Sequence, residues 1–247
     1  MRYSWQLKLG ALLLFLSFLV YLVKFLVLGD PENTYFYVFN ALGFLPVNVL
    51  LVTVVLNELL SVRARNERME KLNMVKGTYF SEAGTDLLGV MVRSDPEIDR
   101  IAHSLVVRDG WDDRDFGRVR GIFSAHTFAT ELGRDDFASL RVFLREKRNF
   151  LLRLLENPLL LEHQSFTALL RAVFHLAEEL DRRGDLGAIP ESDLLHLRKD
   201  AQRVYRLSCG EWLSYMRHLK ENYPYLFSLA VRTNPFDRNA RVVVGGE

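Results

Sequence analysis

Cysteine is nearly absent from this chain: of its 247 residues, only Cys209 is a cysteine. A single thiol excludes an intrachain disulfide framework and any zinc cluster built from cysteines. An excess of charge of one sign is also missing, because 32 lysines and arginines face 31 aspartates and glutamates, which leaves a net charge of +1. Phosphate binding that is independent of sequence needs a surplus of clustered cations, so we expect no nucleic-acid partner.

The motifs of common enzymes are missing too. The sequence contains neither glycine-rich phosphate loop, GxxxxGK[ST] or GxGxxG, and it contains no GxSxG elbow and no HExxH zinc pair. Cys209 lies one helix step from an apolar face, which favours a small, partly buried side chain over a nucleophile. We therefore expect a non-enzymatic protein that needs no cofactor, and we identify no small-molecule substrate.

Long apolar runs, by contrast, are present near the N-terminus. The first extends from Leu9 to Leu28 and the second from Tyr35 to Asn57, separated by a short connector, residues 29–34. A helix needs about 20 apolar residues to cross a bilayer, and a signal peptide has a shorter apolar core and a small-residue cleavage site, which this sequence lacks. The two runs predict a helical hairpin across the lipid bilayer.

The charges around the runs predict its orientation. The connector carries Asp30 and Glu32 but no lysine or arginine, whereas cations follow the second run. Because cytoplasmic flanks are enriched in lysine and arginine, we expect both termini in the cytoplasm and the hairpin in the cell (inner) membrane. The flanking cations are Arg63, Arg65, Arg68, Lys71 and Lys76. We interpret the first four as ordinary interface charges in preference to a specific lipid site.

Small and polar residues within the runs recur at helical spacing. They form one stripe on each helix, and such stripes mark faces turned away from lipid. The favoured interpretation is packing between helices, and the alternative is a water-filled pore enclosed by several copies, with Lys24 near its outer mouth. The stripe of the first helix contains Gly10, Ser17, Tyr21 and Lys24, and that of the second contains Gly43, Pro46, Leu50, Thr53, Asn57 and Ser61.

The rest of the chain predicts an all-α fold. No proline or glycine interrupts residues 50–76, so the second run should continue into the cytoplasm as one helix whose apolar face, from Val62 to Leu87, suits a helical partner. Capping residues, prolines and 3.6-residue periodicity predict further helices over 98–105, 114–126, 134–156, 165–183 and 190–222. Pro224 precedes a short apolar segment, 225–231, which we expect to pack in the core in preference to docking on the membrane or a neighbouring subunit. The expected organisation is a transmembrane hairpin (1–60), a linker helix (61–92), a cytoplasmic helical bundle (93–236) and a C-terminal tail (237–247).

One group of histidines and carboxylates offers a candidate metal site. Helical bundles build such sites from side chains that point inward, but the apolar face of the helix over 165–183 places His175 and Glu178 on the opposite side. We therefore predict no bound metal, and a metal-dependent membrane-anchored enzyme is a third hypothesis that His196→Ala would test. The group consists of Glu162, His163, His175, Glu178, Glu179, Asp193 and His196.

Three segments give the chain a family resemblance. They are LENPLLLEH (155–163), VFHLAEEL (173–180) and HLKENYPYLF (218–227). These segments resemble a group of prokaryotic hypothetical membrane proteins with two N-terminal spans and a helical cytoplasmic region. The resemblance implies an architecture, and it implies no activity and no site residues.

These observations together predict a homo-oligomeric integral membrane protein that acts as a helical scaffold or a signal relay. The two stripes, the uninterrupted helix and the missing catalytic motifs motivate this prediction. The alternative is an oligomeric ion channel whose pore is lined by the second helix.

Overall fold

The computed structural model describes residues 4–28 and 31–243, which form helices, turns and connecting loops without a strand. The predicted all-α fold is thereby confirmed for the described residues. The chain divides into two compact units, residues 1–66 and 67–247, and each unit is described by itself below. Asp30 of the predicted connector and the last four residues of the predicted tail lie outside the described residues.

The first unit consists of α1 (Ser4–Leu28) and the N-terminal part of α2 (Pro31–Tyr79). Both helices are long and apolar enough to cross a membrane by length and composition, and the most apolar window of each contains no buried residue. The side chain of Phe39, for example, is 80% exposed. Pro46 lies inside α2 without ending it, and the predicted continuation of this helix through residues 50–76 is confirmed.

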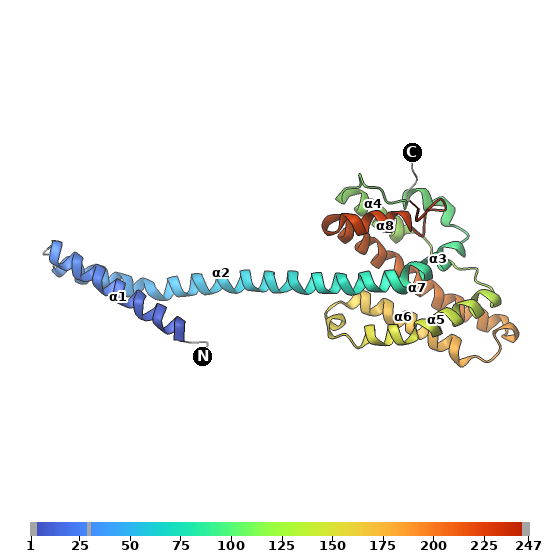
Figure 1. Ribbon diagram of the computed structural model, residues 1–247, viewed down its shortest axis with the longest axis horizontal. Coiled ribbons are helices and arrows are strands. Elements are labelled where there is room, and N and C mark those ends of the chain that lie inside the picture. Colours follow the sequence, from blue (N-terminus) through green and yellow to red (C-terminus); the bar gives the residue numbers. More distant parts are fainter. Residues whose placement is uncertain (1–3, 29–30, 244–247) are drawn as a thin grey trace. The chain divides into compact units, whose positions relative to one another are not determined.

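The second unit is a helical bundle arranged around its longest helix, α7 (Glu191–Asn222). α7 contacts α6 (Gln164–Arg182) on one side, and α4 (Asp113–Ala125) and α8 (Pro224–Arg232) on another (Figure 1). α3 (Thr85–Arg93) also packs on α7, and α5 (Arg134–Leu155) packs on α6. Periodicity predicted α5, α6 and α7 to within two residues at either end, because each helix has a capping residue or a proline at its boundary.

One predicted helix differs from the structure. Residues 98–105 form two short 3₁₀ turns, Ile98–Arg100 and Ala102–Ser104, in place of one α-helix. Pro96 favours the start of a helix. Ile98 and Leu105 are nevertheless both buried, and their packing, not helical spacing, determines the conformation of this segment. In α8, Phe227 is buried, Ala230 and Val231 pack partly buried against the core, and Tyr225 is 72% exposed.

The C-terminal turns of α2 belong to the core of the second unit. Leu72 and Tyr79 are buried, whereas Val62 and Met69, earlier on the predicted apolar face, are exposed. α2 leads into a π-helical turn, Phe80–Gly84, before α3 begins. The helical partner that this face suits is α7 of the same chain, as the contact between Asn73 and His218 shows.

Candidate functional site

The stripe predicted on α1 is partly covered in the single chain. Gly10, Tyr21 and Lys24 are half-buried, and Ser17 is exposed. The Lys24 ammonium lies 3.7 Å from the centre of the Tyr37 ring on α2, which is a cation–π contact. Lys24 therefore has an aromatic partner within its own unit.

The stripe predicted on α2 is exposed along its whole length. Leu50 is 65% exposed, and a Cβ atom built at Gly43 would meet no atom within 4 Å. Ser61 turns its hydroxyl back to donate to the Glu58 carbonyl, 2.8 Å away. Gly43, Pro46, Thr53 and Asn57 are exposed as well.

Lys76 differs in burial from the other cations that follow the second apolar run. Arg63, Arg65, Arg68 and Lys71 are exposed, but Lys76 is buried with 1% of its surface accessible. Its ammonium lies 2.7 Å from the Glu211 carboxylate on α7, and the two side chains are 2% and 8% exposed. The structure separates Lys76 from the four predicted interface cations, because the α2 face that carries Leu72 and Tyr79 also carries Lys76 into the core.

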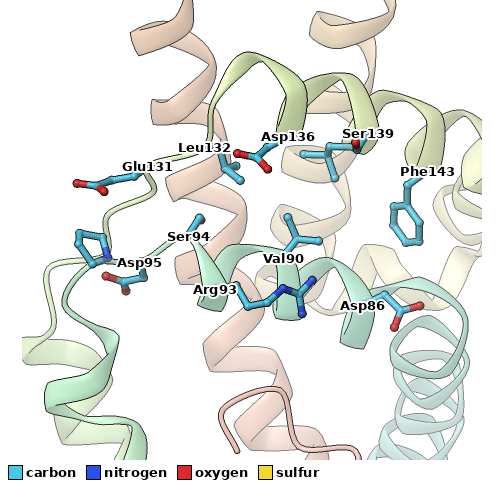
Figure 2. A pocket seen from close by; sticks show the side chains of 12 residues that line it. Asp86, Val90, Arg93, Ser94, Asp95, Glu131, Leu132, Asp136, Ser139 and Phe143 are labelled. Carbon is cyan, nitrogen blue, oxygen red and sulfur yellow. The ribbon is translucent and has the colours of Figure 1, made fainter. Parts of the chain in front are cut away.

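A pocket of about 620 Å³ lies between α3 and the start of α5. Figure 2 shows Asp86, Val90 and Arg93 along one wall, with Asp136, Ser139 and Phe143 along the other. The Asp136 carboxylate accepts a hydrogen bond from the Gly133 amide at 2.8 Å, which caps α5.

At one end of this pocket, the buried Asp95 carboxylate contacts His126 Nε2 at 2.7 Å and accepts from the Glu97 amide at 3.0 Å. Asp95 and Asp136 therefore both make contacts within the protein that stabilise the fold, and neither carboxylate is available to bind a ligand.

Cys209 is completely buried close to Asp95. Burial and the nearby Asp95 carboxylate raise the pKa of the Cys209 thiol well above its usual value. A thiol of raised pKa that solvent cannot reach is a poor nucleophile. The predicted structural role of Cys209 agrees with this burial, which is more complete than the sequence suggested.

Histidines and carboxylates of α6 and α7 meet along the seam between these helices. His196 Nε2 lies 3.4 Å from Asp200 Oδ2 and 3.7 Å from Glu179 Oε2. His175 Nε2 lies 3.5 Å from the same Asp200 oxygen. The Asp200 side chain is 6% exposed, whereas those of His175 and His196 are 45% and 53% exposed. The cluster therefore has a buried carboxylate at its base and two imidazoles open to solvent.

Arg183 forms hydrogen bonds with two carboxylates at this seam. Its guanidinium donates to both Asp193 oxygens at 2.7 Å and to Glu179 Oε2 at 2.7 Å. These hydrogen bonds hold the pKa values of both carboxyls below their usual range. Glu179 and Asp193 are therefore ionised at neutral pH.

The structure brings together only some of the histidines and carboxylates that the sequence offered as a candidate metal site. His175, Glu179 and His196 meet, Asp193 binds Arg183, and the side chain of Glu162 lies outside the described residues. The helical wheel placed His175 correctly on the exposed side of α6, but that side borders α7.

His163 and Glu178 have no part in the cluster. His163 instead caps α6 by accepting a hydrogen bond from the Phe166 amide at 3.4 Å, and Glu178, which is half-buried on α6, contributes no ligand atom to the cluster.

Asp200 was missed by the sequence analysis. It follows His196 by four residues on α7, just as Glu179 follows His175 on α6. Residues four apart share one face of a helix, so this repeated spacing was the signal that could have found it.

Comparison with known proteins establishes the family. A model described as the C-terminal helical domain of uncharacterized protein MJ1433 matches residues 68–232, and one described as the N-terminal helical domain of MJ1433 matches residues 1–60. The chain belongs to the MJ1433 family. The MJ1433 protein of Methanocaldococcus jannaschii is 43% identical over 231 residues, which cover 94% of this chain and 93% of that relative. No solved structure matches the chain.

The resemblance found from the sequence implied an N-terminal and a C-terminal helical region, and the MJ1433 family descriptions likewise name two helical domains. The gap between the two matched regions, residues 61–67, contains the boundary between the compact units at Asn66 and Glu67. The matched descriptions name helical domains and no activity, so the function is argued below from the residues themselves.

Acidification is expected to destabilise the contact between α2 and α7 through His218. Its Nδ1 lies 3.0 Å from Asn73 Nδ2 and 3.1 Å from Asn222 Nδ2, so the ring accepts hydrogen bonds and is neutral. Burial lowers the pKa of His218. The unfolded chain, whose histidines have a pKa of about 6.5, then binds more protons, and stability is lost as the pH falls below that value, by at most about 1.4 kcal/mol per pH unit.

The measurement is the free energy of unfolding of the full chain in detergent between pH 7.5 and 5. His218→Gln, which keeps an acceptor without the titration, should reduce the pH dependence, and His163, whose pKa burial also lowers, accounts for the slope that remains. The matched control is His103→Gln, since His103 is exposed. A His218→Gln profile as steep as the wild type would contradict this assignment.

Proposed function

We propose that the protein is a membrane-anchored, homo-oligomeric helical scaffold or signal-relay module. The hairpin of α1 and α2 would insert in the cell (inner) membrane with both termini in the cytoplasm, and copies would associate through the two polar stripes. The lipid bilayer and further copies of this chain are the proposed partners.

The observation that carries this proposal is the composition of α2 along its length. Between residues 35 and 60 this helix is apolar and exposed, which is costly in water and favourable in a lipid bilayer. Further along the same helix, Leu72, Lys76 and Tyr79 are core residues of the second unit. One helix therefore belongs both to the proposed membrane anchor and to the bundle, so a displacement of its N-terminal part would act directly on core residues.

The exposed stripes support association between copies. Thr53 and Asn57 are polar residues in an otherwise apolar segment, and lipid offers them no hydrogen-bond partner. Polar and small residues promote close packing and hydrogen bonding between helices in membranes. Contact with the stripe of another copy would satisfy these side chains.

Site-specific cross-linking tests the association. Asn57→Cys in the full chain, within native membranes, is expected to form cross-linked homo-oligomers when treated with a short bifunctional thiol reagent. The control Val55→Cys lies about 200° around the same helix and should cross-link poorly. The wild-type Cys209 is buried and provides the background level.

Two outcomes would overturn the proposal. The protein could fractionate with soluble material, which removes the membrane anchor. Alternatively, the mass of the purified chain in mild detergent and in nanodiscs could be that of a single copy, with equal cross-linking at residues 55 and 57, which removes the association through the stripe.

A further inference from the structure

α6 and α7 present matching pairs of potential metal ligands to one another. α6 carries His175 and, one turn later, Glu179, while α7 carries His196 and, one turn later, Asp200. The potential ligand atoms of Glu179, His196 and Asp200 all lie within 4.8 Å of one another. Two helices held together by a buried core therefore bring nitrogen and oxygen donors to one point.

The second observation is the state of Asp200. Its Oδ2 is buried and, within the described part of the chain, accepts no hydrogen bond. A buried carboxylate oxygen that accepts no hydrogen bond costs free energy, on the order of 1–3 kcal/mol or more for a charged group, even with imidazole nitrogens at ion-pair distance. Both neighbouring imidazoles direct Nε2 toward this oxygen, at 3.4 and 3.5 Å. One cation bound between Asp200 Oδ2 and the two imidazole nitrogens would give this oxygen the partner that it lacks.

The separations agree with a small tetrahedral ion. Zinc binds histidine nitrogen at about 2.0–2.1 Å and carboxylate oxygen at about 2.0–2.2 Å, so neighbouring ligand atoms lie roughly 3.3–3.5 Å apart. The distances of 3.4 Å and 3.7 Å from His196 Nε2 to Asp200 and Glu179 come close to that spacing. Small rotations of the exposed His196 ring would bring all three atoms to coordination distance.

The surrounding charges permit a cation. Arg183 contacts Glu179 Oε2, and Arg203 lies 3.7 Å from Asp200, but at the other oxygen, Oδ1. Arg183 thus shares the Glu179 oxygen with the ion, whereas no arginine contacts Asp200 Oδ2 among the described residues, and each histidine offers an imidazole nitrogen. Nitrogen with carboxylate oxygen suits borderline divalent ions such as Zn²⁺ better than Mg²⁺ or Ca²⁺.

We propose that Glu179, His196 and Asp200 bind one divalent transition-metal ion of the zinc type at the seam of α6 and α7. His175, beside the same Asp200 oxygen, or a water molecule completes the coordination. The solvent-exposed imidazoles give the ion an entry path, and the ion cross-links two helices of the bundle. This inference does not depend on membrane insertion or on association between copies.

Zinc titration of the full chain tests the site. The protein is purified in detergent without a histidine tag, stripped with EDTA and titrated with zinc sulfate in competition with a chromophoric chelator. We expect one Zn²⁺ per chain and a zinc-dependent rise in the melting temperature.

Variants identify the ligands. His196→Ala and Glu179→Gln are each expected to weaken zinc binding by at least about tenfold. His103→Ala, which removes an exposed histidine outside the cluster, should bind like the wild type. Because the His196 side chain is 53% exposed, the metal-free variant should melt close to the metal-free wild type, which separates lost binding from lost folding.

Either of two results would overturn the site. One is the absence of saturable zinc binding to the stripped wild-type chain. The other is a His196→Ala variant that binds zinc with unchanged affinity, which would place the ion elsewhere.

Discussion

Lys76→Met is expected to lower the free energy of unfolding by about 3–5 kcal/mol, because it leaves the Glu211 carboxylate buried without its partner. The two side chains are 2% and 8% exposed and their charged atoms lie 2.7 Å apart. The Phe166 ring, with its centre 5.8 Å from the ammonium, helps to exclude water. A charge in such surroundings cannot recover its hydration, so the loss far exceeds that of a surface pair.

The double variant Lys76→Met/Glu211→Leu separates the net contribution of the ion pair to stability from the cost of leaving one buried charge unpaired. Replacing both charges with apolar side chains of similar size removes the uncompensated charge, and it is expected to restore most of the lost stability. The surface pair Arg217–Glu221, at 2.8 Å, supplies the matched control, since its side chains are 41% and 51% exposed. Arg217→Met should cost less than about 1 kcal/mol.

Denaturant unfolding of the full chain in detergent, followed by tryptophan fluorescence to which the buried Trp111 and Trp212 contribute, measures these differences. A Lys76→Met variant as stable as Arg217→Met would contradict the assignment of a dry, buried ion pair. A double variant as unstable as the single one would show that packing around Lys76, and not its charge, carries the effect.

Gly84→Ala is the second substitution with a large expected effect. Gly84 ends the π-helical turn, and a Cβ atom there would lie less than 3.0 Å from ring atoms of both Tyr79 and Phe80. Both rings are buried, and the centre of the Tyr79 ring packs 5.6 Å from that of Phe166. Because the rings cannot move without disturbing the core, we expect a loss of about 1–3 kcal/mol.

Gly77→Ala, two turns earlier, is the matched control. A Cβ atom there would meet the nearest atom, Cε2 of the Tyr215 ring, at 3.4 Å, which is ordinary contact. Alanine also favours the helix over glycine by up to about 1 kcal/mol, so this variant should be as stable as the wild type or more stable. Equal melting temperatures for the two alanine variants would contradict the steric argument at Gly84.

Much of the fold could be predicted because helices are read from local patterns. Asn157 and Pro158 mark the end of α5, and Pro190 marks the start of α7. The residues 98–105 could not be read in this way, since the burial of Ile98 and Leu105 outweighs local helix signals. The π-helical turn at Phe80–Gly84 likewise has no periodic signature.

The candidate sites were predicted less completely than the helices. The apolar face of α6 correctly placed His175 on the exposed side, but a helical wheel carries no information about the neighbour that borders this side. Asp200 belongs to the cluster only because α7 lies beside α6 at a particular rotation. Lys76 shows the same limit: its positive charge grouped it with the exposed cations that follow the second apolar run, whereas its position on α2 led to burial.

The sequence by itself determined the all-α class, the extents of the long helices, the two apolar segments and the polar stripes on them, because each follows from the 3.6-residue repeat within one helix. Only the tertiary structure decided which polar residues meet. Lys76 and Glu211 are far apart in the sequence, and Glu179, His196 and Asp200 lie on two helices. Their encounters depend on how side chains of different helices interlock, and this packing sets the rotation and register of each helix against the next.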